Sequence, residues 1–88
     1  MKRLHFVVTG RVQGVGFRYY CQEQAEKLGL TGYARNMTDG SVEIEVEGES
    51  GRIEEFANAI ARGPRAAKVE NVVRDAREVK GDRSFRIG

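Results

Sequence analysis

The sequence predicts a small α+β domain in which two helices cover one face of an antiparallel sheet. Segments of strand period alternate with two segments of helical period in the order β-α-β-β-α-β, and a short extra strand follows. The pair Asp39-Gly40 separates the second and third strand-like segments and is a strong hairpin signal. The chain has 88 residues, 40% of them hydrophobic, which fits a single domain over residues 1–88.

Runs of β-branched and aromatic residues predict the strands at residues 4–9, 32–37, 41–47, 68–79 and 84–87. In the third run, three apolar residues alternate with glutamates at positions 43, 45 and 47, so we expect one face of that strand to be acidic and solvent-exposed. In the fourth run, Val69, Val72 and Val73 do not alternate strictly, which predicts a bulge or a change of face.

The helices are predicted from apolar residues spaced three and four apart. Phe17, Cys21, Ala25 (or Gln24) and Leu28 share one face of the first helix, which Gly29 ends. In the second helix the apolar face consists of Ile53, Phe56, Ala57 and Ile60, with Ser50 as N-cap and Gly63-Pro64 as the stop. This element order is the ferredoxin-like βαββαβ sandwich, an architecture that serves many functions and therefore identifies none.

The composition argues against several classes of protein and of active site. The net charge is only +2, and acidic and basic residues are interspersed, unlike the dense basic stripe of a nucleic-acid binder. The single cysteine, Cys21, allows no intramolecular disulfide, and with His5 as the only histidine, Ser-His-Asp, Cys-His and His/Cys zinc sites are poorly supported. The apolar run after the N-terminus is too short for a secretory signal and no run is long enough to span a membrane, so we expect a cytoplasmic protein.

The connection after the first strand, Gly10-Arg11-Val12-Gln13-Gly14-Val15-Gly16-Phe17-Arg18, carries the main functional motif. Its glycines directly precede a helix, where free backbone N–H groups and the helix dipole favour an anion. Glycine lets successive amides face one centre, and an arginine at position 18 can bind an oxyanion through two parallel hydrogen bonds. The loop therefore predicts a phosphate-sized anion site, although alone it also fits an ordinary tight turn with a solvated arginine.

A second motif, Gly32-Tyr33-Ala34-Arg35-Asn36-Met37-Thr38-Asp39-Gly40-Ser41-Val42-Glu43, lies on the predicted hairpin. Together the two motifs closely resemble the acylphosphatase family, and the resemblance covers essentially the whole chain. It implies hydrolysis of the carboxyl-phosphate bond of acyl phosphates to a carboxylate and inorganic phosphate. By matching position, it implies that Arg18 is a catalytic residue that binds the phosphate and that Asn36 is a catalytic residue that holds the attacking water. The phosphate would be bound by the backbone amides of Gln13, Gly14, Val15, Gly16, Phe17 and Arg18.

These roles suit the chemistry. A carboxylate is a good leaving group, so the reaction needs positioning and charge stabilisation more than a strong general acid. The carboxamide of Asn36 is no base at neutral pH, but it can accept one hydrogen bond from water and donate another, and our hypothesis is that the substrate phosphate takes the proton. We expect no metal and no cofactor, broad use of small acyl phosphates, inorganic phosphate as product and competitive inhibitor, no nucleic-acid or membrane partner, and a monomer.

Two other functions fit the same elements. A non-catalytic anion-binding module would use the loop alone, and similar domains begin larger hydrogenase-maturation proteins, although no zinc-finger or transferase region follows here. An RNA-recognition module would need aromatic residues on the sheet where this chain has Val42-Glu43-Ile44-Glu45. Among the remaining residues, Asp39 is expected to be a turn residue, and His5 and Arg35 to be strand residues. Tyr19 and Tyr20 could cover the site or pack on the sheet, and we favour packing in the core.

Overall fold

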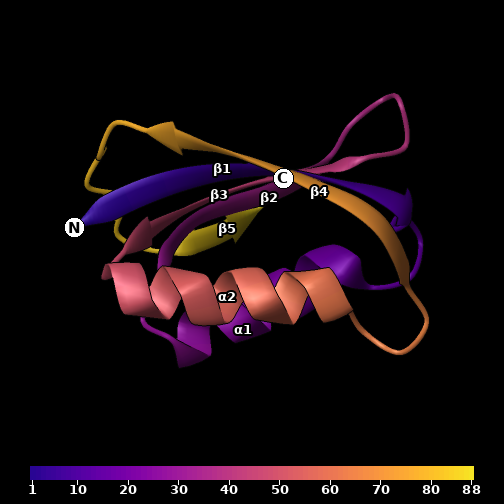
Figure 1. Ribbon diagram of the computed structural model, residues 1–88, viewed down its shortest axis with the longest axis horizontal. Coiled ribbons are helices and arrows are strands. Elements are labelled where there is room, and N and C mark those ends of the chain that lie inside the picture. Colours follow the sequence, from indigo (N-terminus) through magenta and orange to yellow (C-terminus); the bar gives the residue numbers. More distant parts are fainter.

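The computed structural model describes residues 1–88 as one five-stranded sheet and two helices. In chain order the elements are β1 (Lys2–Arg11), α1 (Phe17–Lys27), β2 (Thr31–Asn36), β3 (Val42–Gly48), α2 (Ser50–Arg62), β4 (Lys68–Arg77) and β5 (Phe85–Ile87). The strand order across the sheet is β4-β1-β3-β2-β5, and Figure 1 shows both helices on the same face. The predicted α+β, ferredoxin-like arrangement is confirmed.

The prediction of a purely antiparallel sheet holds for β1 to β4 but is wrong for β5. This three-residue strand pairs in parallel with β2, so the complete sheet is mixed. β4 and β5 are the two edge strands, and the segment between them, residues 78–84, therefore has to pass from one edge of the sheet to the other. That crossing fixes the direction in which β5 enters.

The core lies between the sheet and the helices and is built from the apolar faces that the periodicity predicts. Phe17, Cys21 and Ala25 are the buried residues of α1, and α2 buries Ile53, Phe56, Ala59 and Ile60. The predicted Leu28 and Ala57 are only partly buried and pack against this core. The Phe56 ring lies between Phe6 of β1 and Phe85 of β5, with ring centroids 6.1 and 6.3 Å apart. These contacts hold α2 against strands from both halves of the sheet, and such aromatic contacts add to the free energy of simple area burial.

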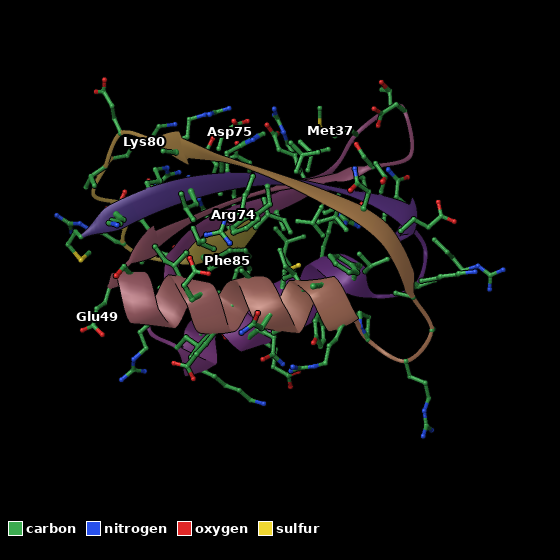
Figure 2. All side chains as sticks on the ribbon, in the orientation of Figure 1. Met37, Glu49, Arg74, Asp75, Lys80 and Phe85 are labelled. Atoms are coloured by element: carbon green, nitrogen blue, oxygen red, sulfur yellow. The ribbon has the colours of Figure 1, made fainter.

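The expectation of a solvent-exposed acidic face on β3 is wrong. Glu45 is only 6% exposed and Glu47 only 2%, on the face of the sheet away from the helices. The guanidinium of Arg3 on β1 contacts both carboxylates, and the Glu47 carboxylate also accepts hydrogen bonds from the backbone amides of Lys80 and Gly81 at 2.7 and 2.9 Å. Residues 78–84 thus cover this end of β3, and Figure 2 shows Lys80 on the side opposite the helices. Alternation revealed which residues share a face, but not what covers it.

The turns and caps follow the predictions with one exception. The Asp39 carboxylate accepts hydrogen bonds from the backbone N and the hydroxyl of Ser41, at 2.9 and 2.6 Å, so Asp39 is a turn residue. The predicted bulge occurs in β4, where the register with β1 moves by one residue opposite Thr9 and Gly10. Ser50 does not cap α2. The helix already includes it, and the preceding residue makes no side-chain cap.

Candidate active site

The loop between β1 and α1 has the backbone conformation of an anion site. Gly14 and Gly16 have φ angles of +74° and +75°, a left-handed region that glycine adopts without steric cost. Gly16 immediately precedes α1, so the first N–H groups of the helix have no partners inside it. Phe17, 1% exposed, anchors the helix start in the core. The result is a rigid helix terminus behind a loop of turned amides, a ready site for a phosphate group.

Arg18 lies in the first turn of α1 with its side chain half-buried. Its guanidinium donates a hydrogen bond to the backbone oxygen of Gly88, just after β5. The arginine is therefore oriented by two elements that are far apart in sequence, the helix that carries it and the last strand of the sheet. A guanidinium held in one direction loses less conformational entropy when it binds an anion.

Asn36 is the last residue of β2 and is exposed. It pairs with Val42 on β3, and the turn that follows is closed by a backbone hydrogen bond from Met37 N to Ser41 O, 2.8 Å long. Figure 1 shows this turn and the loop after β1 at the same end of the sheet. The side chain of Asn36 thus projects from a firmly hydrogen-bonded hairpin rather than from a free loop.

A pocket of about 230 Å³ brings the two motifs together. It is lined by Val12, Gly14, Gly16, Phe17, Arg18, Tyr19 and Asn36. Five of the seven predicted site residues, among them Arg18 and Asn36, therefore share one cavity, whereas Gln13 and Val15 do not line it. A larger and more open depression of about 430 Å³ lies at Tyr33, Arg35 and Arg86, but it contains neither the glycine loop nor a helix start.

Tyr19 corrects one prediction. Packing in the core is the position that the sequence favours, yet Tyr19 is 68% exposed and lines the pocket, which agrees with the alternative that it covers the site. Tyr20, the next residue, does pack inside: its ring lies 6.1 Å from the Phe17 ring, and its hydroxyl donates to the carbonyl of Ala59 at 2.8 Å. A helix turns by about 100° per residue, so neighbouring tyrosines have to face different surroundings.

The pocket is electropositive, because Arg18 is the only charged residue that lines it. The neighbouring Arg35 is paired with Glu43 of β3, and Glu43 also accepts a hydrogen bond from His5 at 2.7 Å. Burial alone would raise the pKa of Glu43, but the hydrogen bonds from His5 and Arg35 outweigh burial and lower it. Glu43 is therefore ionised and paired with Arg35 and His5 rather than with Arg18.

Other reactive groups lie away from the pocket. Cys21 is fully buried on the core face of α1, and burial raises the pKa of its thiol, which keeps it protonated and unreactive. No group of three or more His, Cys, Asp or Glu side chains is placed to hold a metal ion.

Sequence reasoning missed three contributions to the site. The backbone oxygen of Gly88 contacts Arg18, but a backbone acceptor has no sequence signature. Val12 lines the pocket although the sequence marks it only as apolar. The side chain of Gln13 bonds to the β2–β3 turn, whereas the prediction concerned its backbone amide alone. A glutamine inside a glycine-rich loop was the available signal for this last contact.

Comparison with known proteins places the chain among the acylphosphatases. The family model described as Acylphosphatase matches residues 4–87. An acylphosphatase of Vibrio parahaemolyticus is 48% identical over 82 residues, which are 93% of this chain and 91% of that protein. The crystal structure of acylphosphatase from Bacillus subtilis has a TM-score of 0.97 at 38% identity, and the match covers 100% of this chain and 99% of the chain in that structure. 

The fold also recurs inside a larger protein. The crystal structure of full-length HypF in the phosphate- and nucleotide-bound form has a TM-score of 0.89 at 31% identity, and the match covers 99% of this chain but 12% of HypF. Neither α1 nor α2 has the length and apolar character of a membrane-crossing helix. With a family model over almost the whole chain and relatives of matching length, this chain belongs to the acylphosphatase family of acyl phosphate hydrolases, as its two motifs predicted.

Proposed function

We propose that the chain hydrolyses the carboxyl-phosphate bond of small acyl phosphates by in-line attack of a water held on Asn36. The substrate phosphate binds to the backbone amides of residues 13–18 and to the guanidinium of Arg18. The observation that supports this most is the single pocket of about 230 Å³ that Arg18 and Asn36 line together with Gly14 and Gly16. An anion site and a water-positioning group in one cavity are what separate a hydrolase from a phosphate carrier.

The steps follow from the groups present. Water attacks phosphorus, a P–O bond forms, and the bond to the acyl oxygen breaks with its electron pair going to the carboxylate. Charge spread over the equatorial phosphate oxygens is stabilised by Arg18 and the amides, which are directed at the site before the substrate arrives. Asn36 accepts one hydrogen bond from the water and donates another, and the water proton passes to a phosphate oxygen because no carboxylate or imidazole lines the pocket.

The same site accounts for inhibition and selectivity. Inorganic phosphate, the product, fits the same amides and arginine and competes with the substrate. The pocket is small and its groups are suited to the phosphate, so the acyl group extends outward and many acyl groups are accepted. We further propose that residues 1–88 act as one domain, as a cytoplasmic monomer that needs no metal or cofactor.

Benzoyl phosphate hydrolysis in the presence of a chelator tests the reaction and the metal requirement together. Loss of activity with chelator would refute the metal-free reaction, and no hydrolysis above background would leave an anion-binding module as the better description. Arg18→Ala should reduce both turnover and inhibition by phosphate. Removing one transition-state donor costs about 10²–10³ in kcat, and Asn36→Ala should lower kcat by a comparable factor while changing phosphate inhibition much less.

A further inference from the structure

The side chain of Gln13 joins the two halves of the candidate active site. Its amide nitrogen, Nε2, donates to the backbone carbonyl of Met37 at 2.7 Å and to that of Ser41 at 2.9 Å. Met37 directly follows Asn36, and Ser41 directly precedes Val42, the partner of Asn36 in β3. Both bonds therefore end at the base of the turn that directly follows Asn36. Figure 2 marks Met37 at this turn.

The chemistry of the contact requires an amide. Both partners are carbonyl oxygens, which accept hydrogen bonds and cannot donate them, so both hydrogens of Nε2 are used. The same carbonyls already close the turn, since Gly40 N donates to Met37 O and Met37 N donates to Ser41 O, at 3.2 and 2.8 Å. Glutamate at position 13 would place a carboxylate oxygen against two carbonyl oxygens, so the isosteric acid cannot replace the amide.

These two bonds are the only hydrogen bonds between the loop of residues 12–16 and the turn of residues 37–41. The loop holds the phosphate, and Asn36, which holds the water, directly precedes the turn. In a reaction of bound water with bound phosphate, the distance between the two decides the rate. We propose that the side chain of Gln13 is a positioning residue that sets the distance between the phosphate and the water on Asn36. This inference rests on the roles proposed above for the loop and for Asn36.

Two variants separate positioning from phosphate binding. Gln13→Met keeps the length of the side chain but has no donor, and Gln13→Glu keeps the shape but reverses the polarity. A displacement of about 1 Å can cost 10²-fold in rate, so we expect kcat for benzoyl phosphate to fall about 10²-fold in Gln13→Met. The inhibition constant for inorganic phosphate should stay close to the wild-type value, because Arg18 and the backbone amides are untouched. Tyr20→Phe, which removes one hydrogen bond between the helices, is the control and should keep the wild-type kcat.

A pH series gives a readout that loss of stability would not produce. A protonated carboxylic acid can donate one hydrogen bond. The ratio of kcat for Gln13→Glu to that of the wild type should therefore rise as the pH falls, while the same ratio for Gln13→Met stays flat. In the double variant Gln13→Met/Asn36→Ala, the first substitution should add little to the loss caused by the second, because both act through the same water.

Several results would overturn the inference. They are a wild-type kcat in Gln13→Met, a parallel loss of kcat and phosphate affinity, and full additivity with Asn36→Ala. If the Gln13 variants do not fold, the wild-type protein still decides: the side-chain amide protons of Gln13 should exchange slowly with solvent, and fast exchange would refute the contact. Failure of the proposed function has a different signature, namely that Asn36→Ala itself keeps the wild-type kcat.

Discussion

Arg3→Met should destabilise the protein strongly, because Arg3 is the cation of a buried ionic cluster on the face of the sheet away from the helices. Arg3 is 2% exposed, and its guanidinium contacts Glu45, Glu47 and Asp82 at 2.5, 3.1 and 3.0 Å. Removing one partner of a buried ion pair costs about 3–5 kcal/mol, since a desolvated charge is left behind. Here two nearly buried carboxylates would be left, so we expect a loss in that range at neutral pH, a large part of the total stability of an ordinary domain.

The stability lost in Arg3→Met should decrease as the pH falls. In the wild type, burial alone would raise the pKa of Glu45, but hydrogen bonds from Arg3 and Tyr33 outweigh it and lower the value. The backbone amides of Lys80 and Gly81 lower the pKa of Glu47. A depressed pKa stabilises the fold above the usual glutamate pKa of about 4.3, and that stability is lost as pH falls through the lower folded values. Without Arg3, Glu45 loses its main partner and protonates more readily, so the difference between variant and wild type should shrink toward pH 4.

Urea unfolding at pH 7 and pH 4 measures both quantities. The control is Arg74→Met, which breaks the exposed pair of Arg74 with Glu54, where the side chains are 43% and 60% exposed. Exposed pairs contribute little, so this variant should lose far less stability at either pH. The reasoning is refuted if Arg3→Met loses no more than Arg74→Met, or if its loss is the same at both pH values, because the carboxylates would then not be desolvated in the folded protein.

Three further predictions concern single residues. Gly10→Ala should disrupt the pairing of β1 with β4, because a Cβ there would lie 2.1 Å from the carbonyl oxygen of Lys68; an unchanged thermal midpoint would contradict this. Gly16→Ala meets no atom within 4 Å and has to adopt only a φ of +75°. It should therefore cost only about 1–2 kcal/mol in stability. Because Gly16 lines the pocket, the added methyl group should also weaken phosphate inhibition, and an unchanged inhibition constant would mean that the phosphate does not bind against Gly16. The thiol of Cys21 should resist Ellman's reagent until urea unfolds the protein, and rapid labelling of the folded protein would show that the helix opens locally.

The sequence was sufficient to predict the layers of the fold, for a physical reason. Each helix and each long strand has one apolar face, and burying these faces leaves few arrangements for this element order. The direction of β5 could not be predicted the same way, since three residues carry too little periodicity. The burial of Glu45 and Glu47 could not be predicted from the sequence for another reason. It depends on Arg3 and on residues 78–84, which lie far from both glutamates in sequence and become their neighbours only in the folded chain.

The candidate site was predictable where its chemistry resides in the backbone. Gly14 and Gly16 indicate backbone with positive φ angles, and the change from strand to helical spacing of apolar residues at Phe17 indicates the start of a helix. That Arg18 and Asn36 share a pocket came from the family resemblance, because spacing along the chain does not bring a helix turn and a hairpin together. Contacts made through backbone oxygens, such as that of Gly88 with Arg18, carry no residue preference and could not be predicted from the sequence.

The buried Glu47 carboxylate also bears on how the molecules behave in concentrated solution. Both edges of the sheet are poor templates for a further strand: β4 is charged and bulged, and β5 is only three residues long. If β5 detached, β2 would become an open edge with unpaired backbone groups. Because Glu47 binds the backbone amides of Lys80 and Gly81 in the segment that leads into β5, it holds that strand in place. The carboxylate that stabilises the fold therefore also protects the protein against strand-to-strand aggregation.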